Sequence, residues 1–270
     1  MKAFFDFNSN RIEVDLKNPI DISIPLVFNE KQPNTFDIDF ASSEPCRVGD
    51  FVGDTRLGGS CNFEKISFVP HCNGTHTECI GHITDERVYI NRVLKDSFIP
   101  STLITVMTSP FRETNDTYYP NFSGSDNIIS RKHLKDSLLH TNRNFLKGLI
   151  IRTIPNDESK KTRQYSKEEA PFFSIEAIEL ICELGIEHLL VDFPSLDRAF
   201  DDGKLTAHHI YWNIAKETHH LNHDSRIFAT ITEMVYIDKK VADGNYMLNL
   251  QIAPFESDAS PSRPIIYEVK

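Results

Sequence analysis

The feature that most constrains the fold is a strand–helix–strand pattern in the middle of the chain. Residues 148–153 (GLIIRT) and residues 187–192 (EHLLVD) are short apolar runs, each typical of a buried strand. Between them, Ser174 suits the N-cap of a helix that ends near Gly185, a residue favoured just beyond a helix C-terminus. Because two strands joined by a helix usually pair in parallel, this segment predicts a parallel core.

Shorter patterns on both sides extend this core. Residues 130–139 have helical spacing, and the polar stretch 109–126 is typical of a long surface loop. Further strands are predicted at residues 21–27, 63–69, 102–107, 227–232 and 245–252. No internal repeat and no Pro/Gly/Ser-rich linker divides the chain. We therefore expect an α/β fold with one mixed sheet, in a single domain that spans residues 1–270.

Composition narrows the classes of partner. The 270 residues carry a formal net charge of -10, which argues against nucleic acid or an anionic membrane surface as the main partner. No apolar run approaches the roughly 18 residues of a membrane span, and the N-terminal run is too short for a secretory signal. The five cysteines are odd in number and form no CxxC pair. We expect a cytoplasmic protein with reduced thiols that acts on a small-molecule substrate.

The densest chemical signal lies within residues 71–82 (HCNGTHTECIGH). It combines three imidazoles, from His71, His76 and His82, with the carboxylate of Glu78 and the thiol of Cys72. These are ligand types of first-row metals, and an extended backbone would place His76 and Glu78 on one face. The spacing is not a standard zinc signature such as HExxH, so ordinary surface or hydrogen-bonded histidines remain an alternative.

A second group of polar residues lies far downstream. Residues 192–197 (DFPSLD) follow a predicted strand, where α/β folds often place site residues. His208 comes shortly afterwards, and Glu233 ends another apolar run. Taken alone, Glu233 is as well explained by a salt bridge or a helix cap as by a role in a site.

Together the two groups resemble the cyclase family, also called kynurenine formamidase-like. Residues 74–82 (GTHTECIGH) are similar to the family motif H-x-G-T-H-x-D-x-P-x-H, and residues 21–26 (DISIPL) to its D-I-S-x-P-L. Residues 192–197, followed by Ala207-His208-His209, resemble its D-x-P-S-x-D and A-H-x. Glu233 is similar to its late glutamate, and residues 261–264 (PSRP) to its P-x-R.

This resemblance implies a swivelling β/β/α fold in a homo-oligomer, a dimer or tetramer. It also implies a site for one or two zinc or manganese ions that hydrolyses the C–N bond of a formamide or cyclic amide, or a lactone or ester bond, with metal-activated water. No other cofactor is implied. The metal ligands would be His76, Glu78, His208 and Glu233, and His82 would be the catalytic proton shuttle.

Two departures from the motif suggest a divergent branch. Cys72 stands two residues before Gly74, where the family has histidine, and His71 is displaced by one position. Either His71 or Cys72 is therefore a candidate ligand. Glu78 replaces the family's aspartate and has a side chain one methylene longer. A non-catalytic protein that binds a metal or small molecule, or a metal-dependent cyclase or dehydratase, are the alternatives to a hydrolase.

Overall fold

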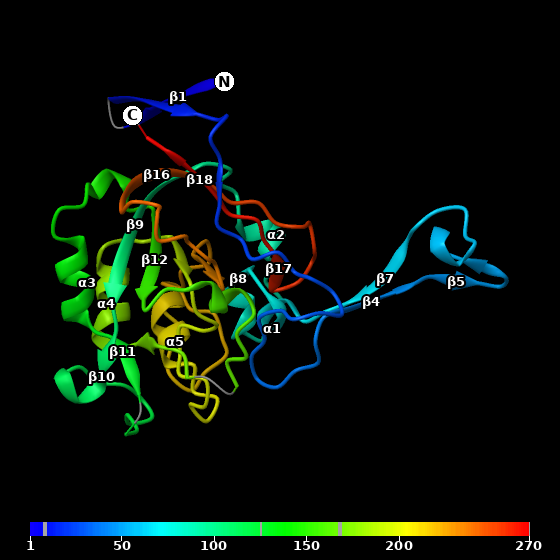
Figure 1. Cartoon of the computed structure of the whole chain (residues 1–270). Coiled ribbons are helices and arrows are strands. Elements are labelled where there is room, and N and C mark those ends of the chain that lie inside the picture. The colour runs from blue at the N-terminus through cyan, green and yellow to red at the C-terminus, as the bar shows by residue number, and fades with distance from the viewer. Residues whose placement is uncertain (8–9, 125, 167–168, 270) are drawn as a thin grey trace.

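The computed structural model describes residues 1–7, 10–124, 126–166 and 169–269. Among these residues, nine strands form one large sheet (Figure 1). Their order across the sheet is β17 (Ala259–Pro261), β8 (His76–Cys79), β15 (Thr230–Glu233), β14 (His188–Val191), β12 (Gly148–Ile154), β9 (Ile99–Met107), β16 (Gly244–Asn249), β18 (Ile265–Glu268) and β3 (Ile20–Asp21).

The centre of this sheet is parallel. Strand β12 pairs in parallel with β9 on one side and β14 on the other, and β14 pairs in parallel with β15. Helix α4 (Ile175–Glu183) connects β12 to β14, and the Ser174 hydroxyl accepts a hydrogen bond from the Ala177 amide at its first turn. The outer strands β8, β17, β16, β18 and β3 are antiparallel to their neighbours. The expected mixed-sheet α/β fold is thus confirmed.

Both faces of the central strands are buried, which explains their continuous apolar runs. Leu149 and Ile151 of β12 pack toward helices α3 (Arg131–Leu138), α4 and α5 (Thr206–Trp212), whereas Ile150 packs into the cluster on the opposite face. Figure 1 shows these three helices together on one side of the sheet. Each fully buried aliphatic side chain stabilises the fold by ~1.5–3 kcal/mol, so the core holds the strand ends beyond it in place.

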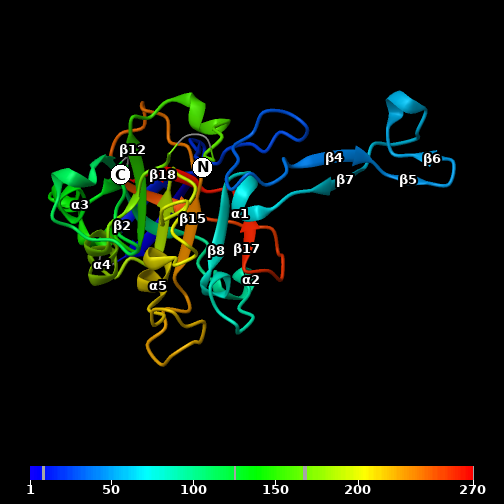
Figure 2. The same ribbon diagram turned by 90° about the horizontal axis from the view of Figure 1, so that it is seen from below.

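A two-stranded arm projects from this body (Figures 1 and 2). Strands β4 (Ser42–Pro45) and β7 (Glu64–Ser67) form its stem, and β5 (Arg47–Val48) and β6 (Phe51–Val52) form its tip. All four residues of β7 are exposed. The sequence predicted a strand here, and the strand exists, but residues 63–69 add nothing to the main sheet. Side chains alternate between the two faces of a strand, and Phe63 and Ile66 are three positions apart. The two apolar side chains therefore cannot lie on one face.

Three other strand predictions were wrong in their bounds. Of the predicted strand 245–252, only the part up to Asn249 lies in β16. The other two errors have a local cause. Strand β3 ends at Asp21, because the Asp21 carboxylate accepts hydrogen bonds from the Ser23 amide and hydroxyl and turns the chain. Residues 227–229 form a turn rather than a strand, and β15 begins only at Thr230. Both errors arise where local side-chain bonds or turns interrupt an apolar pattern.

The remaining elements are short. They are hairpin strands β1 (Lys2–Phe7) and β2 (Asn10–Asp15); strands β10 (Ser109–Pro110), β11 (Asn127–Ile129) and β13 (Phe172–Phe173); helices α1 (Pro70–Asn73) and α2 (Ile90–Val93); and the 3-10 turns η1 (Thr55–Leu57), η2 (Ile80–His82), η3 (Phe111–Glu113), η4 (Arg143–Phe145) and η5 (Glu158–Lys161). In the described parts of the chain, no helix is long and apolar enough to cross a membrane.

Candidate metal centre

Strand β8 brings two chemical groups to one place. His76 and Glu78 alternate along the strand and therefore share a face, and both are almost completely buried. The strand lies between β15 and β17, which supply the neighbouring residues Glu233 and Ala259 in register with His76 and Glu78. Three strands from distant parts of the sequence therefore meet at the site.

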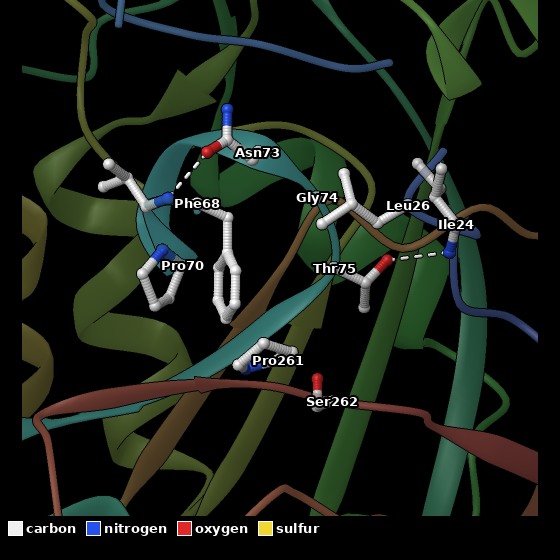
Figure 3. Close-up of a pocket in the computed structure, with 10 residues that line it drawn as sticks. Ile24, Leu26, Phe68, Pro70, Asn73, Gly74, Thr75, Pro261 and Ser262 are labelled. Atoms are coloured by element: carbon white, nitrogen blue, oxygen red, sulfur yellow. Dashed lines mark hydrogen bonds between the residues drawn. The ribbon is translucent and has the colours of Figure 1, made fainter. Parts of the chain in front are cut away.

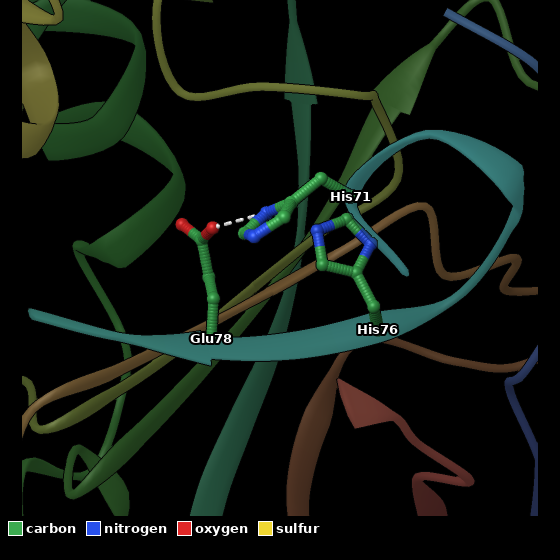
Figure 4. Close-up of side chains that lie close together, drawn as sticks. All are labelled: His71, His76 and Glu78. Carbon is green, nitrogen blue, oxygen red and sulfur yellow. Dashed lines mark ion pairs between the residues drawn. The ribbon is translucent and has the colours of Figure 1, made fainter. Parts of the chain in front are cut away.

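The Glu78 carboxylate is the centre of this group. His208 Nε2 donates to Glu78 Oε1 at 3.0 Å, and His71 Nδ1 lies 2.9 Å from Oε2. His82 Nε2 lies 3.9 Å from the same oxygen. Figure 4 shows the rings of His71 and His76 beside this carboxylate. One carboxylate therefore faces imidazoles from helix α1, turn η2 and helix α5.

His208 is held in place from behind by Asp197. Asp197 Oδ2 accepts from His208 Nδ1 at 2.5 Å and from the His208 amide at 3.2 Å. Its Oδ1 accepts from the Tyr118 hydroxyl at 2.7 Å and from the Ala207 amide at 2.6 Å. A carboxylate on the far nitrogen fixes the orientation of an imidazole, so His208 presents Nε2 to the site.

His76 and Glu233 complete the inner group. His76 Nδ1 donates to the Gly74 carbonyl at 2.9 Å, which leaves Nε2 facing Glu233 Oε2 at 3.4 Å. Glu233 Oε1 accepts from the Leu196 amide at 3.0 Å and lies 3.8 Å from His208 Nε2. The carboxylate of Glu233 therefore lies between two imidazole nitrogens.

The pKa shifts of these residues come from the pairing of imidazoles with carboxylates. Burial alone would lower the pKa of His71, but its contacts with Asp258 and Glu78 raise that pKa to about 10. Burial would likewise lower the pKa of His208, yet its bonds to Asp197 and Glu78 raise it well above the ordinary value. Burial tends to raise the pKa of Glu78, but the charges of His82 and His208 hold it low. Protonated imidazoles thus balance the carboxylates.

These residues fit a divalent metal ion. Ligand atoms of His71, His76 and Glu78 lie within 4.8 Å of one another, and so do those of Glu78, His82 and His208. In addition, His76 Nε2 and Glu78 Oε2 are buried and make no hydrogen bond of good geometry to any described residue, although Glu233 and His71 lie close to them. Buried polar atoms without partners are costly, and one cation between them would satisfy both. Imidazole and carboxylate ligands suit zinc and manganese.

The geometry separates the two alternatives that the sequence left open. His71 reaches Glu78, whereas Cys72 belongs to none of the ligand groups that the described residues form within 4.8 Å. Cys72 is buried, and burial, with the charge of Glu233, raises the pKa of its thiol to about 11. Because His71 belongs to these groups and Cys72 does not, the arrangement favours His71.

Sequence reasoning missed Asp258. Its Oδ2 lies 2.8 Å from His71 Nε2 and 3.4 Å from His82 Nδ1. Hydrogen bonds from His71 and His82 hold the pKa of Asp258 far below its ordinary value, against the opposing effect of burial. The only signal was its position, three residues before the Pro261-Ser262-Arg263 stretch.

A small pocket adjoins the site (Figure 3). Its volume is about 160 Å³, and it lies beside the Gly74-Thr75 segment that leads into His76. Phe68, Pro70 and Pro261 line it, so its walls are mainly apolar. The Thr75 hydroxyl accepts from the Ile24 amide and donates to the Met234 carbonyl, which ties this wall to the strand that bears Glu233.

Comparisons with known proteins place the chain in a family. The family model of the Cyclase family, described as "Putative cyclase", matches residues 14–198. That range includes His71, His76, Glu78 and Asp197, but His208, Glu233 and Asp258 lie beyond it. No curated protein matches the sequence.

Two solved structures are similar over nearly the whole chain. One is described as a "predicted metal-dependent hydrolase from Bacillus stearothermophilus"; it has a TM-score of 0.58 and 14% identity, over 93% of this chain and 98% of that one. The other is isatin hydrolase A from Labrenzia aggregata bound to benzyl benzoate, with a TM-score of 0.58 and 12% identity, over 94% of each chain. At such identities the likeness concerns the fold.

Proposed function

The chain belongs to the Cyclase family, and from that premise we propose that it is a metal-dependent hydrolase. Its substrate is a small molecule with a formamide, cyclic amide, lactone or ester bond. The observation that carries this proposal is the Glu78 carboxylate, buried among His71, His82 and His208. Nearby, His76 Nε2 is buried and makes no hydrogen bond to a described residue.

In this proposal the metal is held by His71, His76, Glu78, His208 and Glu233. It is zinc or manganese, and two carboxylates among these ligands allow one or two ions. A bound divalent cation supplies a water of lowered pKa and a Lewis acid for a carbonyl oxygen. The mainly apolar pocket beside Gly74 and Thr75 suits the hydrocarbon part of a small substrate.

His82 is the proposed proton donor. Its side chain is 27% exposed, which is more than that of Glu78 or His208, so it lies on the solvent side of the ligands. A proton held on its Nε2 can pass to the leaving nitrogen or oxygen when the bond breaks. General acid catalysis of this kind is typically worth about 10²–10⁴ in rate.

The test combines metal content with activity. Wild type purified without chelator is expected to contain zinc or manganese by mass spectrometry, and His76→Ala is expected to lose it. His82→Ala should keep its metal while kcat on the active substrate falls by about 10²–10⁴. His223→Ala is the matched control, because the His223 side chain is 98% exposed and contacts only Asp224 among the described acidic residues.

A panel of formamides, cyclic amides, lactones and esters then identifies the bond. Wild type that binds no metal after incubation with zinc and manganese would contradict the proposal. Metal binding without turnover of any substrate would favour a non-catalytic binding protein. A product that has lost water or closed a ring would instead identify a cyclase or dehydratase.

A further inference from the structure

Asp258 is fixed beside the proposed metal centre by its own strand. Strand β17 pairs with β8, with Ala259 in register with Glu78, and the Cys79 amide donates to the Asp258 carbonyl at 3.0 Å. The Ser257 hydroxyl donates to Asp258 Oδ1 at 3.1 Å. These bonds leave the other oxygen, Oδ2, directed at the histidines.

That oxygen contacts two imidazoles at once. His71 Nε2 donates to it at 2.8 Å, and His82 Nδ1 lies 3.4 Å away. The two rings stack with their centroids 4.2 Å apart and an angle of 27° between their planes. Because one nitrogen of each ring faces Asp258, the other nitrogen of each ring, His71 Nδ1 and His82 Nε2, faces Glu78.

We propose that Asp258 is the positioning carboxylate of this centre. It orients His71 so that Nδ1 is the ligand nitrogen, and it orients His82 so that Nε2 is the nitrogen that faces the substrate. Asp258 itself touches neither the metal nor the substrate. This inference rests on the proposed function, because it assigns a role within the same site.

The arrangement parallels the one at His208. There Asp197 contacts Nδ1 and leaves Nε2 for the site, whereas Asp258 serves two rings with one oxygen. A carboxylate behind a ligand histidine fixes its orientation and raises its basicity, and its loss typically lowers metal affinity by about 10–100-fold. Asp258 side-chain exposure is 30%, so water reaches this position and an asparagine of nearly the same shape fits it.

The experiment measures zinc and manganese affinity by competition with a chelator. We expect Asp258→Asn to bind about 10–100-fold more weakly than wild type, with an unchanged number of ions per chain. Glu256→Gln is the matched control, because Glu256 is two residues away and pairs with Arg92 on the surface. It should bind metal as wild type does.

A cobalt-substituted protein gives a second readout. Reorientation of His71 in Asp258→Asn should change the visible absorption of bound cobalt, which a purely structural role would leave unchanged. Affinity within about twofold of wild type with an unchanged spectrum overturns the inference. Fewer ions per chain in Asp258→Asn would also overturn it, because Asp258 would then be a direct ligand. Wild type without any metal would instead refute the proposed function.

Discussion

Asp197 offers the sharpest test of how the site is held. Its two oxygens accept four hydrogen bonds, from the Tyr118 hydroxyl, the Ala207 amide, the His208 amide and His208 Nδ1. The side chain is almost fully buried. Asp197→Ala leaves all four donors without that acceptor, including a protonated imidazole. Removal of one partner of a buried ion pair costs about 3–5 kcal/mol, which is a large part of the roughly 5–15 kcal/mol of a typical domain.

Asp197→Asn keeps the shape of the side chain and removes its charge, so it separates the two contributions to stability. The amide keeps one oxygen as an acceptor but turns an N–H group toward some of the donors, so we expect a loss of about 1–3 kcal/mol. Tyr118→Phe is the reference, because it keeps the Asp197 carboxylate and removes only the two hydrogen bonds of the hydroxyl, one to Asp197 and one from the Arg198 amide. At about 0.5–1.5 kcal/mol for each bond, it should cost about 1–3 kcal/mol.

The assay is urea unfolding in the presence of a chelator, followed by two independent probes. Wild type is expected to be the most stable and Asp197→Ala the least stable, with Tyr118→Phe and Asp197→Asn between them and the slope of the transition unchanged. A free energy of unfolding for Asp197→Ala within about 1 kcal/mol of wild type would refute the reasoning, because such donors cannot lose their acceptor at so small a cost.

Four further predictions concern the metal ligand, the protonation of His71, the pH dependence of stability and the oligomeric state. His71→Ala should lose bound metal, whereas Cys72→Ser should retain it; the reverse result by metal analysis would make Cys72 the ligand. At pH 7, metal binding should release protons, because the pKa of His71 is raised to about 10 without metal. Calorimetry in buffers of different ionisation enthalpy measures the number of protons released. A release of zero would contradict the prediction. For the same reason, the stability that His71 contributes without metal is present below about pH 6.5 and lost as pH rises through about 10. We also expect a dimer or tetramer by light scattering; a monomer at micromolar concentration would refute that.

The parallel core was predictable because the sequence patterns that specify it are formed by neighbouring residues. Apolar runs 148–153 and 187–192, a capped helix between them and a glycine after it depend on neighbouring residues alone. Residues 63–69 show the limit of this reasoning. Their pattern indicates a strand, but nothing in it says whether the strand joins the sheet or projects into solvent, as β7 does.

The site was predictable only in part, and for a related reason. His76 and Glu78 lie on one strand, so their common face follows from alternation. Asp258 contacts His71 across 187 positions of sequence, and no spacing rule reaches so far. The choice between His71 and Cys72 depended on how the single turn of α1 directs each side chain, which the spacing leaves open.

The position of β8 between β15 and β17 also affects when the site can form during synthesis of the chain. A ribosome makes the strand that bears His76 and Glu78 first, and both of its neighbours come from the last fifth of the chain. About 150 residues separate β8 from β15, so at 5–20 residues per second the wait is roughly 8–30 s. During that interval both edges of β8 are open, and its carboxylate lacks the imidazole of His208. The proposed metal centre can therefore form only after Glu233 and the rest of β15 have been synthesised.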